Sequence, residues 1–231
     1  MQYTLGIKRL TLGLLILVLS ALAHAGGSPP VGIAITGGLS GVGTDIAIGL
    51  SDHFDVRGTV AGYNLNRDGS YGTTTSWRAS IKLLQGGLLI DYRPLKGTFH
   101  LSAGVVDDGN QLKMRALTSG GTFKFNGTAY PSGDISSASA SVEWSKAVLY
   151  LGMGWGNLAS ARGFHLISDI GVLFAGHPKA NVDVNCSAQG EGENVCGQLS
   201  TDVAAEQSKL QNDADKLSFW PILRVGVGYT F

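Results

Sequence analysis

Six charged side chains stand within apolar segments of this sequence, where they could pair with one another away from water. Three are acidic and three are basic, so each carboxylate has a possible cationic partner. The six residues are Asp45, Arg57, Asp91, Lys146, Asp169 and Arg224. Because isolated charges are costly in an apolar environment, we predict that these residues form a network of ion pairs and hydrogen bonds. Asp169 and Arg224 lie near the middle of their segments and are expected at its centre.

The last eleven residues, 221–231, show what kind of segment holds these charges. Apolar side chains alternate there with small or polar ones, and Arg224 has the parity opposite to the apolar set. The apolar set is Leu223, Val225, Val227, Tyr229 and Phe231. A period of two residues with one apolar and one charged face is typical of a β-strand between lipid and a polar lumen.

Three further regions contain two alternating runs joined by a short turn, at residues 45–63, 83–106 and 147–174. Together with the last strand they make seven strands, whereas a closed single-chain bacterial barrel needs an even number. The apolar run at residues 31–37 supplies the eighth strand. We therefore predict an all-β fold, an eight-stranded antiparallel up-and-down transmembrane β-barrel.

The predicted connections alternate between short turns and longer polar loops at residues 64–76, 118–137 and 175–218. In outer-membrane barrels the short turns are periplasmic and the long loops extracellular, which places both chain ends in the periplasm. Residues 107–110 resemble a tight turn. A turn there would add a strand, and an odd number of strands would put the two chain ends on opposite sides of the membrane. We interpret residues 107–110 as a kink or bulge, with residues 111–117 continuing above the membrane and residues 122–130 available to pair with them.

The same alternation assigns a lipid face and a lumen face to every predicted strand. Polar residues with lumen parity include Gln85, His100 and His165 beside the charged residues above. An aromatic girdle is expected at the periplasmic strand ends, formed by Phe54, Tyr92, Phe99, Trp155, Phe164, Tyr229 and Phe231. Eight strands enclose an interior just wide enough for side chains to fill, so we predict a plugged lumen. Gated conduction of small ions is the alternative.

The amino terminus indicates export. Lys8 and Arg9 precede a mostly apolar run at residues 10–22, and Ala23 and Ala25 provide small residues for cleavage. This order is typical of a cleaved signal peptide at residues 1–25, followed by a single barrel domain at residues 26–231; a retained anchor is the alternative. Removing Lys8 and Arg9 from the 17 basic residues leaves 15 against 17 acidic ones. That balance gives no indication of nucleic-acid binding.

Cys186 and Cys196 lie ten residues apart in a polar, glycine-rich stretch of this exported chain. In an oxidising compartment we expect them to form a local disulfide that staples a loop. A metal pair is the alternative, although no histidine flanks the cysteines at ligand spacing. The sequence shows neither a metal motif nor a phosphate-binding glycine loop, so we predict no cofactor.

Residues 199–217 depart from the strand pattern. Leu199, Val203, Leu210 and Leu217 recur near helical spacing, and Ser200 or Thr201 can cap the start. By strand parity this helix belongs to the last extracellular loop. We expect its narrow apolar stripe to pack on the barrel rim or the disulfide loop, with a partner-binding helix as the alternative.

With its signal peptide, hairpin pairs and final strand, the chain resembles the small outer-membrane barrels of Gram-negative bacteria, in particular the OmpA-type transmembrane domain. The resemblance implies a monomer surrounded by outer-membrane lipid and lipopolysaccharide. It also implies that Tyr229 and Phe231, at the end of the last strand, form the signal recognised by the barrel assembly machinery. It says little about activity, because this architecture hosts anchors, adhesins and lipid-modifying enzymes.

An enzymatic alternative rests on His100 and Ser102. Their spacing resembles the His-x-Ser pair of lipid A deacylase barrels, in which a histidine activates a serine and a carboxylate orients the histidine. Here both residues follow a predicted periplasmic turn, far from the outer leaflet. We therefore favour a non-enzymatic protein with a structural role or a surface-interaction role through an extracellular partner of its loops; a narrow ion channel and a lipid-modifying enzyme are the alternatives.

The proposed assembly signal leads to a test. Replacing Phe231 with alanine should reduce the amount of protein recovered in the outer-membrane fraction, because the terminal aromatic is lost. Immunoblots of fractionated cells would measure this, with Phe219→Ala as a control that removes an aromatic outside the terminal signal. Wild-type levels of Phe231→Ala in the outer membrane would contradict the prediction.

Overall fold

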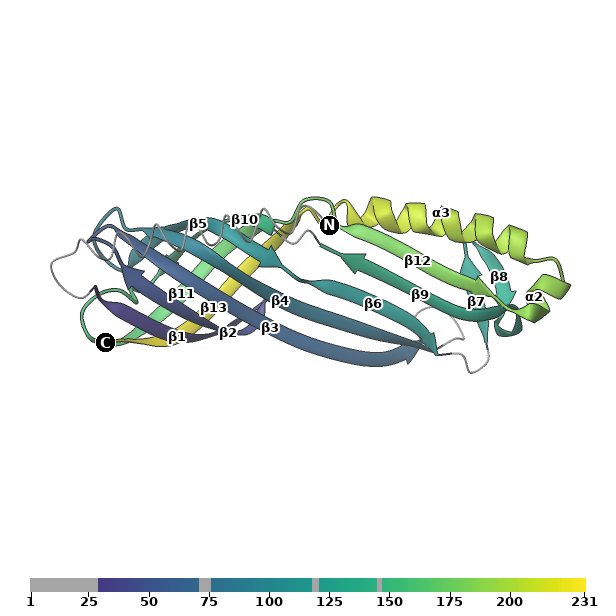
Figure 1. Cartoon of the computed structure of the whole chain (residues 1–231), viewed down its shortest axis with the longest axis horizontal. Coiled ribbons are helices and arrows are strands. Elements are labelled where there is room, and N and C mark those ends of the chain that lie inside the picture. The colour runs from purple at the N-terminus through teal and green to yellow at the C-terminus, as the bar shows by residue number, and fades with distance from the viewer. Residues whose placement is uncertain (1–28, 71–75, 118–120, 145–146) are drawn as a thin grey trace.

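A computed structural model describes residues 29–70, 76–117, 121–144 and 147–231. The predicted signal peptide, residues 1–25, and Lys146 lie outside the described residues. Figure 1 colours the described residues from purple near the first strand to yellow at the carboxyl terminus.

Eight of the described strands form a closed antiparallel ring. In ring order they are β1 (Val31–Gly38), β2 (Gly41–Gly49), β3 (Phe54–Ser70), β4 (Ser76–Tyr92), β5 (Phe99–Asp108), β10 (Ala147–Trp155), β11 (Gly163–Phe174) and β13 (Phe219–Thr230). Pairing of β1 with β13 closes the ring, with Gly32 opposite Thr230 and Gly38 opposite Arg224. The predicted eight-stranded barrel is confirmed.

The barrel has an apolar outer surface and a polar interior. The exposed residues along its strands are large and apolar, including Ile35, Val60, Leu151, Leu166 and Val225, whereas the residues between them are buried. Soluble proteins rarely expose so continuous an apolar surface, which fits a surrounding of lipid. This alternation is the one predicted for a transmembrane barrel. None of the described helices combines the length and the apolar character needed to cross a membrane.

Two strands continue well beyond the barrel. β3 and β4 have 17 residues each, whereas a tilted strand crosses the membrane with about 9 to 11. Their far halves continue the same sheet into β6 (Gln111–Leu117), β9 (Ile135–Glu143) and β12 (Lys179–Cys186), a region that we call the extension. Figure 1 shows the barrel at one end of the molecule and the extension at the other.

The barrel and the extension separate at residues 107–110, where the kink was predicted. Along β4, Gln85 pairs with Asp108 of β5 and Lys82 pairs with Gln111 of β6, so no residue is inserted. The buried Asn110 side chain accepts a hydrogen bond from the Leu84 amide at 3.1 Å. Below this point β5 pairs with β10 and closes the barrel; above it β6 pairs with β9 and builds the extension.

The extension corrects the predicted loops. Residues 64–76 contain the continuation of β3, and the other two predicted loops contain most of the extension's remaining elements. Residues 122–130 do not pair with residues 111–117; instead β7 (Thr122–Phe125) and β8 (Thr128–Pro131) pair with each other. In the turn between β7 and β8, Asn126 has a φ angle of 50° and Gly127 one of 89°. Positive φ angles at both positions are typical of a tight hairpin turn.

The predicted helix is present as α3 (Cys196–Ala214), in the connection between β12 and β13. It follows the short helix α2 (Ala188–Gly192), and a 3-10 helix, Ser132–Asp134, precedes β9. Leu199 of α3 packs with Phe123, Tyr130 and Ala138, so the helix and the β7–β8 hairpin cover one face of the extension. Cys186 and Cys196 form the predicted disulfide, which ties the end of β12 to the start of α3.

A polar cluster joins the β7–β8 hairpin to α3. Asp202 accepts hydrogen bonds from the Tyr130 hydroxyl at 2.6 Å and from the Asn126 amide at 3.2 Å. These bonds favour the ionised carboxylate and lower the pKa of Asp202 to about 2. Burial and the neighbouring Asp202 raise the pKa of Tyr130 to about 12.

This cluster predicts an acid-sensitive contact. Because the pKa of Asp202 falls from 3.8 to about 2 on folding, ionised Asp202 stabilises the contact above about pH 4. That stabilisation should be lost as the pH falls toward 2. Limited proteolysis of the hairpin with an acid-active protease would measure the loss. Asp202→Asn should weaken this pH dependence, and an unchanged pH profile in that variant would contradict the assignment.

Candidate functional site

The centre of the barrel interior is occupied by a cluster around Arg57, which is 3% exposed. Two Arg57 nitrogens contact both carboxylate oxygens of Asp169 from the opposite wall, at 2.9 and 3.0 Å. Arg57 Nη1 also lies 3.2 Å from Asp45 Oδ2. Arg57 Nη2 donates to Asp91 Oδ1 at 3.0 Å; its Nε lies 2.8 Å from Asp91 Oδ2, as an ion pair without hydrogen-bond alignment. One guanidinium therefore binds carboxylates from three other strands.

Arg224 adds a second cation to this cluster. Its Nε donates to Asp169 Oδ2 at 3.0 Å, and its Nη1 donates to Asp45 Oδ1 at 3.1 Å. Nη1 also donates to the Thr59 hydroxyl at 2.7 Å. Asp45 and Asp169 are thus shared between the two arginines, and the cluster links β2, β3, β4, β11 and β13 across the lumen.

The backbone leaves room for the cluster on β10. A Cβ atom at Gly154 would lie 2.7 Å from His100 Nε2 and 2.8 Å from Asp169 Oδ1. Both distances are shorter than real side chains allow. Gly154 therefore lets His100 and Asp169 approach each other in front of β10.

His100 and Ser102 are both buried in the cluster, but on different carboxylates. His100 Nε2 lies 3.1 Å from Asp169 Oδ1, whereas Ser102 donates to Asp91 Oδ1 at 2.6 Å and accepts from Arg57. A hydrolytic triad requires the histidine to be within hydrogen-bond reach of the serine. In the described interior these two side chains instead take part in the charge network.

A second ion pair lies toward the end of the barrel that carries the chain terminus. Arg93, just after β4, pairs with Asp55 of β3, and both side chains are buried. Sequence reasoning missed this pair because Arg93 was assigned to a turn. Asp55 shares the parity of Arg57, which is the signal that could have placed it in the lumen.

Apolar side chains fill the lumen on both sides of the central cluster. On the terminus side, Leu158 from the turn after β10 packs with Ala34, Ala47 and Ile167, and its carbonyl accepts a hydrogen bond from Thr230 at 2.9 Å. On the extension side, the layer consists of Leu89, Val106, Val148, Tyr150, Leu173 and Ile222.

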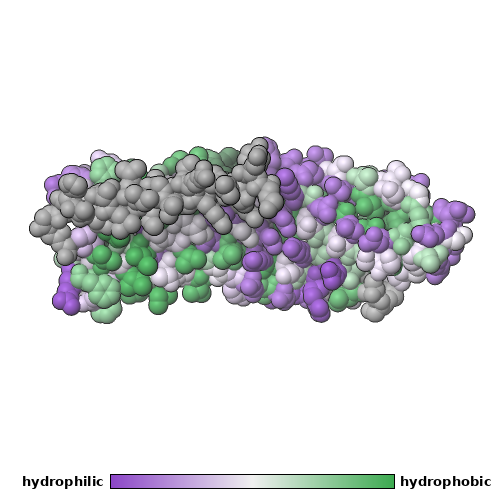
Figure 2. All heavy atoms as spheres, viewed as in Figure 1, coloured by the Kyte–Doolittle hydropathy of each residue, from purple (hydrophilic) through white to green (hydrophobic). Residues whose placement is uncertain are grey.

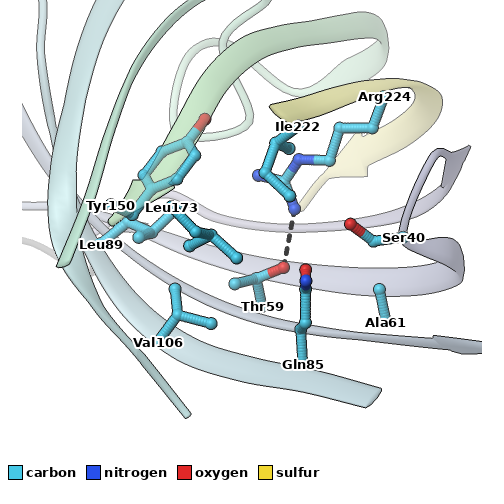
Figure 3. A pocket seen from close by; sticks show the side chains of 10 residues that line it. All are labelled: Ser40, Thr59, Ala61, Gln85, Leu89, Val106, Tyr150, Leu173, Ile222 and Arg224. Carbon is cyan, nitrogen blue, oxygen red and sulfur yellow. Dashed lines mark hydrogen bonds between the residues drawn. The ribbon is translucent and has the colours of Figure 1, made fainter. Parts of the chain in front are cut away.

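Between this second layer and Arg224 a cavity of about 30 Å³ remains. Figure 3 shows the side chains that line it, including Gln85, Thr59 and Tyr150. Such a volume has room for about one or two water molecules. This volume is small compared with that of an aqueous pore across a barrel.

Five of the six charged residues singled out from the sequence meet in one place: Asp45, Arg57, Asp91, Asp169 and Arg224. Lys146 lies outside the described residues. Arg57 lies at the centre of the cluster together with Asp169 and Arg224. His165, which shares the lumen parity, bonds with the Ala161 carbonyl at 3.0 Å, in the turn after β10. The rings of Tyr229 and Phe231 meet edge to face at the end of β13, where their role as an assembly signal stays a prediction.

No known protein-family model matches the chain, and no curated protein matches it. Solved structures do match. Acinetobacter baumannii CarO2 has a TM-score of 0.56 and 17% identity, over 88% of this chain and 99% of that one. Acinetobacter baumannii CarO has a TM-score of 0.54 and 16% identity, over 87% and 98%. A major outer membrane protein from Thermus thermophilus aligns with a TM-score of 0.42 and 14% identity.

The two CarO structures show a similar fold along almost their full length, and at this identity they bear on the fold alone. The apolar outer surface and closed ring agree with that likeness. The chain is therefore an integral membrane β-barrel, an architecture typical of bacterial outer membranes.

The central cluster predicts a large effect of removing one arginine. Arg57→Met should destabilise the barrel by about 3 to 5 kcal/mol, because Asp45, Asp91 and Asp169 would lose a shared buried cation. Urea unfolding of the detergent-solubilised barrel, followed by heat-modifiable migration on gels, would measure this. Arg78→Met, which breaks an exposed, solvent-screened pair with Asp68, should have only a small effect. Equal losses in the two variants would contradict a special role for the cluster.

Proposed function

We propose that this protein is a monomeric, non-enzymatic outer-membrane anchor that presents the extension on the cell surface. The observation that carries the proposal is the continuity of β3 and β4. Each runs without interruption from the charged cluster in the barrel into the extension. A sheet built on strands held in this way has a fixed direction relative to the barrel, which suits a structural or surface-interaction role.

The connection lengths support an orientation with the extension outside. Short connections after β2, β4 and β10 lie at the barrel end that also holds Phe231. The extension and the long connection from β11 to β13 lie at the opposite end, where the two-residue turn between β1 and β2 is the one short exception among the described connections between barrel strands. Since outer-membrane barrels keep short turns in the periplasm and long loops outside, we assign the carboxyl terminus to the periplasm.

The filled lumen favours an anchor over a channel. The central cluster lies between two apolar layers, and the side chains of Asp45 and Asp169 are at most 1% exposed. An ion crossing the barrel would have to displace bonded charges as well as apolar side chains. The engagement of His100 and Ser102 with separate carboxylates likewise favours a structural role over lipid hydrolysis.

Planar-bilayer recording tests the proposal. Purified wild-type protein that shows heat-modifiable migration should produce no discrete conductance steps, because the cluster and both apolar layers block the lumen. Arg224→Ala removes a cation that borders the cavity and serves as the comparison; it should unfold more easily or admit ions. Regular steps from the wild-type protein, altered in size by Arg224→Ala, would overturn the anchor proposal in favour of a narrow ion channel.

A further inference from the structure

The outer face of the extension changes character abruptly where β3 and β4 leave the barrel. This face continues the lipid-facing surface, because the same residue parity points outward along each strand. Moving away from the barrel on β4, the outward-facing residue changes from the exposed Leu84 to Lys82. On β3 the outward-facing residues change from the exposed Val60 and then Gly62 to Asn64. Figure 2 shows apolar residues over the barrel and mostly hydrophilic ones where β3, β4 and β6 emerge. The upper limit of the lipid contact therefore lies between these positions.

Three rows of paired residues cross the extension above this limit, and every outer-face side chain in them is polar or charged. The first row is Asn64, Lys82, Gln111, Glu143 and Lys179. The second is Asn66, Ser80, Lys113, Ser141 and Asn181, and the third is Asp68, Arg78, Arg115, Ser139 and Asp183. We call this surface the polar face. Within the described chain, α3 and the β7–β8 hairpin pack on the opposite face, around Phe123, Ala138 and Leu199.

Cations collect in the middle of the polar face. Lys82, Lys113, Arg78 and Arg115 project from the neighbouring strands β4 and β6. The Lys113 ammonium lies 3.8 Å from a Glu143 carboxylate oxygen, beyond hydrogen-bond distance. Arg78 donates two hydrogen bonds to the Asp68 carboxylate, at 2.8 and 2.9 Å. Among the described residues, Lys82 and Arg115 have no carboxylate partner. These two exposed cations are therefore available to an anionic ligand.

The height of these cations above the lipid suggests what that ligand is. Lys82 lies two residues beyond Leu84, about 7 Å farther along the strand. Arg78 lies about 20 Å beyond Leu84 along the same strand. With strands tilted by about 40°, both positions fall where headgroups and their sugars extend from the membrane. Exposed asparagine and half-buried serine side chains around the cations can exchange hydrogen bonds with sugar hydroxyls. Lysine and arginine bind phosphate through charge-assisted hydrogen bonds.

We propose that the polar face binds the phosphorylated sugar headgroups of lipopolysaccharide in the leaflet from which the extension rises. Lys82, Lys113 and Arg115 contact phosphate, and the serine and asparagine residues contact sugar. The inference rests on the orientation assigned under the proposed function, and it names a partner that this function leaves open. It also gives the extension a means of standing upright in a dense layer of anionic glycolipid.

The test uses the full-length protein in phosphatidylcholine nanodiscs with and without lipopolysaccharide. K82Q/K113Q/R115Q removes three cations from the polar face. K96Q/K124Q/K216Q removes the same charge from positions off that face and is the matched control. Heat-modifiable migration verifies that each variant is folded. Native mass spectrometry then measures the lipopolysaccharide retained, with dephosphorylated lipopolysaccharide and free inorganic phosphate as further arms.

The polar-face variant should bind lipopolysaccharide about tenfold to a hundredfold more weakly than the wild type and the control variant. Wild-type binding should weaken with salt and fall strongly on dephosphorylation of the glycolipid. Equal retention by the two triple variants, or equal binding of phosphorylated and dephosphorylated lipopolysaccharide, would overturn the proposal. Phosphate binding without lipopolysaccharide binding would do so too. These outcomes are distinct from a failure of the anchor proposal, which would appear as ion conductance.

Discussion

The contacts between Arg57 and three aspartates are the interaction on which the rest of the structure depends. In a barrel of eight strands the side chains of opposite walls meet, so a charge from one wall must be neutralised by the others. Arg57 does this for Asp45, Asp91 and Asp169, and Arg224 shares two of the same carboxylates. The bonds join strands that are far apart in sequence and fix how the ring closes.

The same constraint connects the barrel with the extension. β3 carries Arg57 and β4 carries Asp91, and these are the two strands that continue beyond the membrane. Two adjacent strands alone would be only marginally stable, but β6, β9, β12, the hairpin and α3 provide additional pairing and a small core. The cluster in the lumen therefore positions the extension, whose own stability comes from its additional strands and its core.

Much of the barrel could be predicted from the sequence, because strands between lipid and a polar interior alternate with a period of two. Residues 221–231 set the parity that assigns Leu223 outward and Arg224 inward. The extension was harder to predict. β9 alternates serine with the small residues Ala138 and Ala140, which have little β-propensity, and β12 lies within residues 175–218, which were predicted to be a loop. Pairing with neighbouring strands, which no local pattern reveals, makes these segments strands.

For this protein the sequence by itself determined the barrel, its strand count, the faces of its strands, the disulfide and the helix. These features depend on local periodicity and spacing. Only the tertiary structure decided which charges meet, since Arg57 and Asp169 are 112 residues apart and contact each other only after ring closure. It also decided that His100 and Ser102 bond to different carboxylates, and that the kink at residues 107–110 divides one sheet into a closed barrel and an open extension. Such contacts depend on strand register around the whole ring.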